Sequence, residues 1–428
     1  MTRSVQVISM RTWGELGNLL AGRTLAATLA AGLDDAEVTV IEAETLFPQF
    51  AEAGAAIREL VAARLPADEV RAGYLRLMTD FTDRLPAGLD DDPPPAATVD
   101  RLAPVADHFA RTKPDLVIGT KGVISRLSHA ALRIADLPTP VVNYVTNEGL
   151  LRLPVHRAPH LPVHLVQFDR ARDYLVREHG YRPERVVPVG RLLAQAQAAQ
   201  VFEGAAAGIG GAAAGIGEAD AVGAADPALT AAGTRILILS NRGGREYLAA
   251  LERIARAHPE AALVFIAYNN PALAAEAAEL LTGLGRSAWQ TFDRLAQGDY
   301  LRYLAWLHAA DAPLFISKTG PNSMLEGLYF GIPQLLVRSG LPMEEWVGPF
   351  LAEHGVGRGF DRMEELVEVA VRWVGDPDEL PGRRRRATSL ARTLLDPDRA
   401  RRRTVAAVGA VLDGVPLRID EEETCSPE

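Results

Sequence analysis

The segment from residue 313 to residue 357 holds the residue types and spacing that best indicate a binding site. An apolar, strand-like run stops at Ser317-Lys318-Thr319-Gly320, and a helix follows from about Asn322 with Glu326 in its second turn. A strand, a tight turn and a helix N-terminus make a site for an anion, because unpaired backbone N–H groups and the helix dipole point at it. A carboxylate one turn further in can accept hydrogen bonds from vicinal hydroxyls such as those of a ribose. The pattern therefore predicts phosphate or ribose contacts from Ser317, Thr319, Gly320, Asn322 and Glu326; the alternative is that the first three only cap the helix.

Two more polar segments follow apolar strands in the same half of the chain. A strand at residues 334–337 leads into a polar loop with Glu344 and Glu345, which by residue type alone could be a plain acidic loop. A strand at residues 235–240 leads into a turn with Gly243 and Gly244. These glycines either contact a diphosphate or only let the chain turn tightly into a helix.

Strands and helices alternate along both halves of the chain. In the first half the apolar runs predict strands at residues 5–9, 37–41, 115–119, 140–145, 161–168 and 186–189. In the second half they predict strands at residues 235–240, 262–267, 289–292, 313–317 and 334–337. Strands separated by helices predict parallel, doubly wound sheets, and such sheets bind ligands at the carboxyl ends of their strands.

A change in composition suggests the domain boundary. The heptapeptide GAAAGIG occurs twice in tandem, at residues 204–210 and 211–217. We expect a flexible linker or surface loop at residues 201–233, between an N-terminal domain (1–200) and a C-terminal domain (234–395). The helix at 396–413 should cross back to the first domain, and residues 414–428 should form a disordered acidic tail.

The order of these motifs resembles the donor-binding half of the GT-B glycosyltransferases. It is most similar to the branch of MurG, the monogalactosyldiacylglycerol synthases and the processive diacylglycerol glucosyltransferases. In that branch a strand ending Ser/Thr-Lys-x-Gly leads to a helix whose Glu binds the ribose of a UDP-sugar, and a later loop, often Pro-Gly-Gln-Glu-Glu, contacts the sugar. The resemblance puts Glu326 at the ribose position and Met343-Glu344-Glu345 at the sugar position. Met343 replaces the usual Gln, so the resemblance leaves the sugar open.

The resemblance covers nearly the whole chain, apart from the linker, the helices at residues 51–85 and the tail. It implies an α/β fold of the GT-B type, with two doubly wound Rossmann-like domains facing a central cleft. The turn at Gly243 and Gly244 is similar to the family's diphosphate-binding glycine loop. Phe292 would lie beside the nucleobase, with a core aromatic as the alternative, and His156 is similar to a His of the family's W-x-H stretch, with a structural histidine as the alternative.

The acceptor side departs from the family pattern. The family loop after the first strand runs Gly-x-Gly-His, and its His is the base that deprotonates the acceptor hydroxyl. Counting back from Leu25 places Asn18 at that position, and an amide cannot act as a base. Asn147 likewise stands where the family has an Asp. Glu15, three residues before Asn18, is the nearest carboxylate and is either the replacement base or a solvated loop residue.

Composition limits the classes of partner. The 428 residues carry 45 Lys and Arg against 55 Asp and Glu, a net charge of −10 that argues against nucleic-acid binding. The dense basic runs at residues 383–386 and 399–403 are either solvated helix faces or a weak contact with an anionic acceptor or membrane surface.

A single cysteine, Cys425, excludes a disulfide framework. With a strand beginning at Val5 and no apolar run of about 20 residues, we expect a cytoplasmic protein without signal peptide or membrane span. The oligomeric state stays open.

The resemblance implies an inverting glycosyltransferase that moves a sugar from a nucleotide-activated, UDP-linked donor to a hydroxyl acceptor. The acceptor is a small secondary metabolite or a lipid. No metal or further cofactor is expected, since helix N-termini and glycine-loop amides would stabilise the departing diphosphate. Two other classes remain open: a non-hydrolysing UDP-sugar 2-epimerase, and a GT-B-like nucleotide-binding module that has lost its catalytic His.

Overall fold

The computed structural model describes residues 2–11, 17–63, 65–192, 227–240 and 244–417. Glu15, Gly243, most of the proposed linker and most of the proposed tail lie outside these ranges. The chain divides into two compact units. Unit 1 comprises Met1–Val61, Ala72–Ala194 and Leu394–Glu428, and unit 2 comprises Ala62–Arg71 and Gln195–Thr393.

Unit 1 is built on a six-stranded parallel sheet. Its strand order is β2-β1-β3-β4-β5-β6. The strands are β1 (Arg3–Ser9), β2 (Ala36–Glu42), β3 (Leu116–Gly119), β4 (Val141–Tyr144), β5 (Val163–Val166) and β6 (Val186–Pro188). Its helices are α1 (Gly17–Gly32), α2 (Ala43–Leu46), α3 (Gln49–Ala62), α4 (Ala67–Asp83), α5 (Ala96–Thr112), α6 (Gly122–Ile134), α7 (Asp169–His179) and α17 (Pro397–Leu412), with short 3₁₀ turns η1 (Glu148–Arg152), η2 (Pro154–His156) and η3 (Pro183–Arg185). The first turn of α4 belongs to unit 2.

Unit 2 holds a second six-stranded parallel sheet, in the order β12-β11-β10-β7-β8-β9. The strands are β7 (Thr234–Leu239), β8 (Ala262–Ile266), β9 (Trp289–Phe292), β10 (Ala312–Lys318), β11 (Gln334–Val337) and β12 (Gly357–Phe360). The helices are α9 (Pro227–Ala231), α10 (Arg245–Ala257), α11 (Pro271–Gly283), α12 (Gln297–His308), α13 (Pro321–Tyr329), α14 (Val347–Glu353), α15 (Met363–Gly375) and α16 (Glu379–Leu394), with the 3₁₀ turn η4 (Pro342–Glu344).

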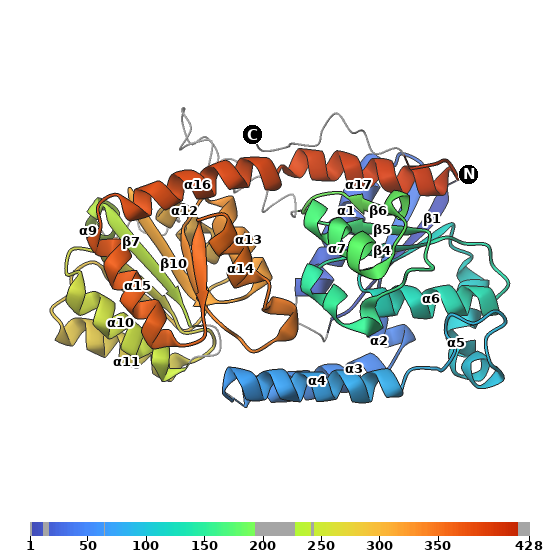
Figure 1. Cartoon of the computed structure of the whole chain (residues 1–428), viewed down its shortest axis with the longest axis horizontal. Helices are drawn as coiled ribbons and strands as arrows, with labels where there is room; N and C mark the ends of the chain where they lie inside the picture. The colour runs from blue at the N-terminus through green and yellow to red at the C-terminus, as the bar shows by residue number, and fades with distance from the viewer. Residues whose placement is uncertain (1, 12–16, 64, 193–226, 241–243, 418–428) are drawn as a thin grey trace. The chain divides into compact units, whose positions relative to one another are not determined.

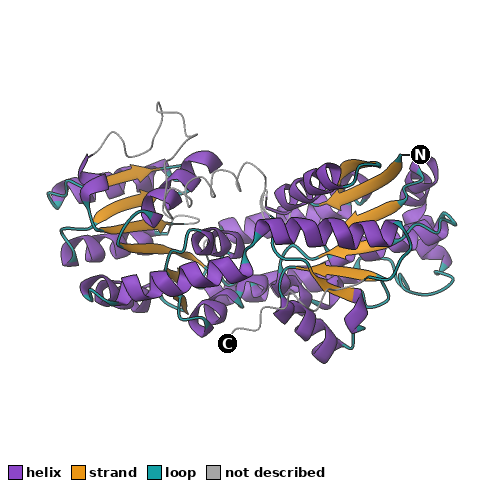
Figure 2. Ribbon diagram, turned by 90° about the horizontal axis from the view of Figure 1, so that it is seen from above, coloured by secondary structure: helices purple, strands orange, loops and turns teal. Residues whose placement is uncertain are grey.

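Helices cover both faces of each sheet, and Figure 2 shows them in purple around the orange strands of each unit. In unit 2, residues of α10, α11 and α15 form one apolar core with the sheet, and residues of α9 and α12 form another on the opposite face. Strands covered on both sides must be apolar along their whole length, which explains runs such as Ile236–Leu239. The predicted pair of doubly wound Rossmann-like sheets is confirmed.

The last helix of the described chain packs in unit 1. Ala400, Ala407 and Val408 of α17 join one buried cluster with Leu25 and Leu29 of α1. Figure 1 shows the two helices side by side. None of the helices in the described ranges has the length and apolar character needed to cross a membrane.

Both sheets reverse their strand order beside their first strand. In unit 1 the reversal lies between β1 and β3, and in unit 2 between β7 and β10. Crossovers on the two sides of such a switch point leave toward opposite faces, so the carboxyl ends of the two strands border an open crevice. Candidate site residues should therefore be sought after Ser9, Gly119, Leu239 and Lys318, where these strands end.

Gly340 determines how the loop after β11 packs. Its φ is +82°, and a Cβ at this position would lie 2.2 Å from the carbonyl oxygen of Ala67, the first residue of α4. An L side chain is disfavoured at positive φ, and here it would also overlap backbone. Glycine is therefore required for this loop to meet the start of α4.

Replacing Gly340 by Ala should lower the free energy of unfolding by about 2–4 kcal/mol, because the left-handed strain adds to a steric overlap. The matched control is Gly285→Ala. Gly285 has a φ of +66° with no atom within 4 Å of its Cβ position, so only the strain of about 1 kcal/mol should appear there. Urea unfolding of both variants measures the difference, and equal losses would show that the contact with Ala67 is not made.

Candidate active site

The end of β10 and the start of α13 form the predicted anion site. Gly320 is the N-cap residue of α13, with an extended φ of −87°, and Pro321 occupies the first helical position. Because glycine has no side chain, the N-cap residue itself supplies no cap to the backbone N–H groups of the first turn. Ser317 is buried and Asn322 is exposed on that turn. The predicted strand, tight turn and helix thus occur together, and their contact with a phosphate stays a prediction.

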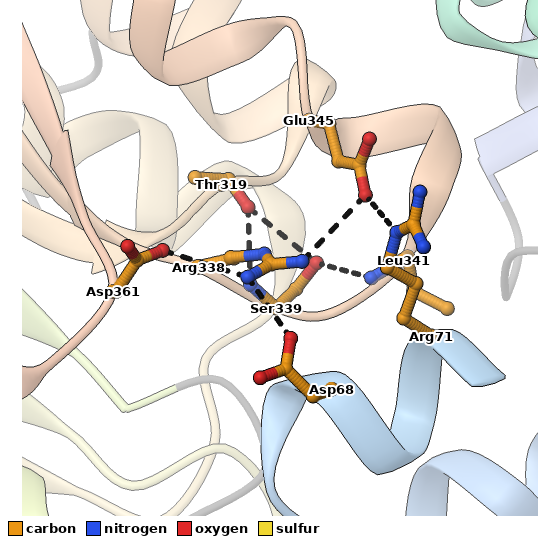
Figure 3. Close-up of polar contacts among 8 residues, drawn as sticks. All are labelled: Asp68, Arg71, Thr319, Arg338, Ser339, Leu341, Glu345 and Asp361. Atoms are coloured by element: carbon orange, nitrogen blue, oxygen red, sulfur yellow. Dashed lines mark hydrogen bonds and ion pairs between the residues drawn. The ribbon is translucent and has the colours of Figure 1, made fainter. Parts of the chain in front are cut away.

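Thr319 holds the neighbouring loop. Its hydroxyl oxygen accepts a hydrogen bond from the backbone N–H of Ser339 at 3.2 Å and lies 3.4 Å from the Ser339 hydroxyl oxygen (Figure 3). The Ser339 hydroxyl in turn accepts the N–H of Leu341 at 3.1 Å. Thr319 therefore ties the end of β10 to the loop that follows β11.

Glu326 is half-buried on α13 and faces a tyrosine of α12. Burial raises the pKa of Tyr300 well above its ordinary value, and the Glu326 carboxylate raises it further. The tyrosine thus keeps its proton beside the carboxylate. Part of Glu326 remains accessible to a ligand hydroxyl.

Lys318 is part of a motif in the sequence, and in the structure it forms a largely buried ion pair at this edge. Its amine lies 2.9 and 3.2 Å from the two carboxylate oxygens of Glu344, and the side chains are 16% and 10% exposed. An ion pair this far out of water depends on the geometry of both partners. Glu344 is therefore positioned by the last residue of β10.

The N-terminus of α10 already has a carboxylate beside it. Gly244 is its N-cap residue, and a Cβ there would lie 1.9 Å from Oε2 of Glu246. An acidic side chain in the first turn interacts favourably with the helix dipole. Glu246 and Glu344 both raise the pKa of buried Tyr247, after the larger effect of burial. A diphosphate at Gly244 would therefore have to displace the Glu246 carboxylate.

Glu345 belongs to an ion cluster that the sequence does not reveal (Figure 3). Its carboxylate accepts from Nε of Arg71 at 2.7 Å and lies 3.8 Å from Arg338. Arg338 also lies 3.1 Å from Asp68 and 3.6 Å from Asp361. A groove of about 550 Å³ lies beside the cluster. Because Arg71 and Asp68 are on α4, in a segment outside the family resemblance, only the fold shows this association.

Phe292 contributes to the core of unit 2. Its ring lies 5.2 Å from the ring of Tyr303 at 54°, and it packs partly buried against the apolar cluster of α9 and α12. The structure thus gives Phe292 the core role that the sequence left as an alternative. Its place beside a nucleobase stays a prediction.

Asn18 joins three strand ends of unit 1. Its backbone oxygen accepts the Ser9 hydroxyl at 2.7 Å, and its side-chain oxygen accepts the Thr146 hydroxyl at 3.1 Å. Thr120 completes the set by donating to the Ser9 hydroxyl oxygen at 3.2 Å. The Asn18 amide therefore has a positioning role at the carboxyl ends of β1, β3 and β4, and it cannot itself act as a base.

Asn147 and His156 have structural surroundings. The Asn147 side chain accepts the N–H of Gly149 at 2.9 Å and so caps η1. His156 is 1% exposed, and its pKa lies well below its ordinary value because of burial, with smaller contributions from Lys121 and Arg126. A buried, neutral imidazole fits the structural alternative for His156.

Two titratable residues at the carboxyl ends of the unit 1 strands are not evident from the sequence motifs. Lys121, after β3, is 4% exposed, and burial lowers its pKa to about 7 against the opposing effect of Glu44. Glu148, after β4, has its pKa raised to about 7 by burial, although Arg170 lies 2.8 Å away and opposes the shift. Lysine's rarity in this chain is a signal that could have drawn attention to Lys121.

No protein-family model and no curated protein sequence matches this chain. Among solved structures, a putative UDP-N-acetylglucosamine 2-epimerase from Listeria monocytogenes is similar at 15% identity and a TM-score of 0.57, over 98% of this chain and 100% of that one. TcCGT1 in complex with UDP is similar at 12% identity and a TM-score of 0.54, over 97% and 100%. MurG of Acinetobacter baumannii is similar at 13% identity and a TM-score of 0.50, over 97% and 99%. The chain therefore has the two-domain, Rossmann-like α/β fold that these GT-B glycosyltransferases and epimerases share.

Proposed function

We propose that the chain is an inverting GT-B glycosyltransferase that uses a UDP-linked sugar donor. The observation that carries the proposal is the edge of unit 2 at β10, where Lys318, the glycine-capped start of α13 and Glu326 follow one another on a strand, turn and helix. The solved TcCGT1 structure, which has the same fold, contains UDP. These two observations support a nucleotide-sugar donor.

The donor would be held by charge and by backbone amides. The N–H groups at the start of α13 and the Lys318 amine would receive the diphosphate, and Glu326 would accept the ribose hydroxyls. Lys318 can do this without leaving Glu344, because an ammonium has three N–H donors. In the reaction, an acceptor oxygen would attack the anomeric carbon from the face opposite the diphosphate. UDP would leave with the electron pair of the broken bond, stabilised by these donors and with no metal ion required.

The contacts of the basic run at residues 383–386 favour a small acceptor over a lipid surface. Arg383 is bound to Glu379 at 2.6 Å and lies over the ring of Trp373 at 3.8 Å. Arg384 donates to the carbonyl of His308 at 2.9 Å, and Arg386 to that of Gly355 at 2.9 Å. These guanidinium groups thus already have partners within unit 2. We propose a secondary metabolite with a free hydroxyl as the acceptor.

An epimerase is the second candidate, because the Listeria structure shares the fold at a TM-score of 0.57. Incubation with UDP-glucose, UDP-galactose and UDP-N-acetylglucosamine distinguishes the candidates. Release of UDP supports the transferase, conversion of one UDP-sugar into its 2-epimer supports the epimerase, and binding without turnover supports a nucleotide-binding module. Absence of both binding and turnover over the whole panel would contradict the proposal.

Replacing Glu326 by Ala should weaken UDP binding about tenfold or more, because each hydrogen bond to the ribose is worth roughly 1 kcal/mol or more. Isothermal calorimetry of the purified chain measures the affinity. Tyr300→Phe is the matched control: it removes the hydroxyl beside Glu326 and leaves the carboxylate, so UDP affinity should be retained. An unchanged affinity in the Glu326 variant, or an equal loss in both, would refute the ribose assignment.

Substitutions of the two acidic loop residues, Glu344 and Glu345, should have different effects on the affinity for the UDP-sugar relative to UDP. Glu344→Gln should weaken binding of the UDP-sugar relative to UDP by about fivefold, because the carboxylate held by Lys318 would face the sugar hydroxyls. Glu345→Gln should leave the ratio of the two affinities unchanged, because that carboxylate is held by Arg71 and Arg338. Competition binding with UDP and UDP-glucose tests both variants, and a ratio unaltered in Glu344→Gln would remove this residue from the sugar site.

A further inference from the structure

The groove of about 550 Å³ in unit 2 is lined by more cationic than anionic side chains. Its guanidinium groups belong to Arg71, Arg338 and Arg358, and its carboxylates to Glu345 and Asp361. All of these residues lie in unit 2, including Arg71 in the first turn of α4. The chain as a whole has a net charge of −10, so this excess of guanidinium groups runs against the average composition. Guanidinium groups bind carboxylates and phosphates in a forked geometry, so the groove has the chemistry to hold an anionic group.

Two glycines and three apolar side chains form another part of the groove lining. A Cβ on Gly348 of α14 would lie 2.9 Å from the Cα of Gly359 in β12, and a Cβ on Gly359 would lie 2.8 Å from the Cα of Gly348. The helix and the strand therefore meet backbone to backbone, with no side chain between them. Leu341, Pro349 and Phe360 line the groove beside these glycines. Ligand sites typically combine such apolar surface with a few charged groups, which suits a ring that carries an acidic substituent.

Arg358 is the guanidinium group of the groove that carries no carboxylate partner. Its side chain is exposed on β12 and lies over the ring of Phe360, 5.2 Å from the ring centroid. Within the described ranges of the chain, its guanidinium forms no ion pair or hydrogen bond with another residue. A cation over an aromatic face is held in place by the ring while its N–H groups stay available. A ligand anion could therefore use these donors without breaking an ion pair.

A carboxylate of the protein already lies between the other two guanidinium groups (Figure 3). Glu345 accepts from Nε of Arg71 at 2.7 Å and lies 3.8 Å from Arg338. Asp68 and Asp361 also lie near Arg338, but their side chains are 86% and 78% exposed, and ion pairs of such exposed groups contribute little in water. Glu345 is thus the main internal competitor for an incoming carboxylate.

The groove begins at the turn that the proposed function assigns to the donor diphosphate. Thr319 lines it, and the next residue, Gly320, is the N-cap of α13. The Thr319 hydroxyl accepts the N–H of Ser339, the residue that follows Arg338. A donor sugar is bonded directly to the diphosphate, so its substituents lie within reach of the residues beside this turn. The groove is therefore placed to receive a substituent of the sugar.

We propose that the donor sugar is a uronic acid, whose carboxylate is bound in this groove by Arg338, with Arg358 as a second guanidinium group. This inference rests on the proposed function and specifies its donor. The ligand carboxylate takes the place of Glu345 on Arg338. A neutral hexose has a hydroxymethyl group instead of the carboxylate, and its hydrogen bonds to a guanidinium are weaker because only one partner is charged. The two arginines would thus decide which sugar is accepted.

The first test compares UDP-glucuronate with UDP-glucose, two donors that differ only at C6 of the sugar, by isothermal calorimetry. The wild-type chain should bind UDP-glucuronate about tenfold more tightly. Arg338→Gln should abolish this preference and Arg358→Gln should reduce it about threefold, while both variants still bind UDP. Arg256→Gln is the matched control, because Arg256 pairs with Glu252 on α10 at 2.8 Å and does not line the groove. Equal affinity for the two donors in the wild type, or the full preference in both groove variants, would overturn the proposal.

The second test removes the internal competitor and keeps all of the arginines, so it does not depend on how Arg338→Gln folds. Glu345→Gln should bind UDP-glucuronate about fivefold more tightly than the wild type, because the ligand carboxylate no longer displaces a charged one. Its affinity for UDP-glucose should stay unchanged. An unchanged or lower affinity of this variant for UDP-glucuronate would show that the sugar carboxylate does not bind at these guanidinium groups.

Glucuronate without a nucleotide distinguishes a donor sugar from an unrelated organic acid. Free glucuronate should bind at least about 10²-fold more weakly than UDP-glucuronate, because the nucleotide contacts are missing. If free glucuronate binds as tightly as UDP-glucuronate, the groove serves a separate acid and the proposal is overturned. A chain that binds neither UDP nor any UDP-sugar would refute the proposed function as well, whereas binding of UDP with no preference for UDP-glucuronate refutes this inference alone.

Discussion

In each parallel sheet the strand order reverses beside the first strand, which is β1 in unit 1 and β7 in unit 2. The candidate chemistry of this chain depends on that constraint. Next to each reversal, one strand ends in a short turn and a helix begins. At such a point the strand ends, the helix N-termini and their unpaired N–H groups are brought together by topology alone. Polar side chains there can meet a ligand without interrupting the apolar cores on the two faces of the sheet.

The sheets could be predicted from the sequence because strands buried on both faces are continuously apolar and short. The local parts of the candidate site could also be predicted from the sequence, since Lys318, Gly320 and Glu326 follow one another within nine residues. Each belongs to one strand-turn-helix unit, whose geometry depends little on the rest of the chain. Local geometry and sequence pattern therefore agreed at this edge.

Contacts between distant parts of the chain could not be predicted in this way. Glu345 is held by Arg71, which lies 274 residues earlier, and the Asn18 amide is held by Thr146, 128 residues later. Neither pairing leaves a periodic or compositional signal. The loop of Glu344 and Glu345 looked uniformly acidic in the sequence. In the fold, the carboxylate of Glu344 pairs with the largely buried Lys318, and that of Glu345 contacts two more accessible arginines.

Lys121 and Lys318 occupy similar positions beside the switch points of the two sheets, but their surroundings differ. Lys318 is the last residue of β10 and Lys121 lies two residues after β3, and both side chains are largely removed from water. Lys318 has a carboxylate 2.9 Å from its amine, so it is built as half of an ion pair and suits the binding of further anionic oxygens. At Lys121 the desolvation cost exceeds the stabilisation from Glu44, and the same functional group becomes one that can exchange a proton at neutral pH. The two lysines therefore differ in what surrounds their amines, which is a carboxylate at 2.9 Å for Lys318 and mainly buried surroundings, with an electrostatic effect of Glu44, for Lys121.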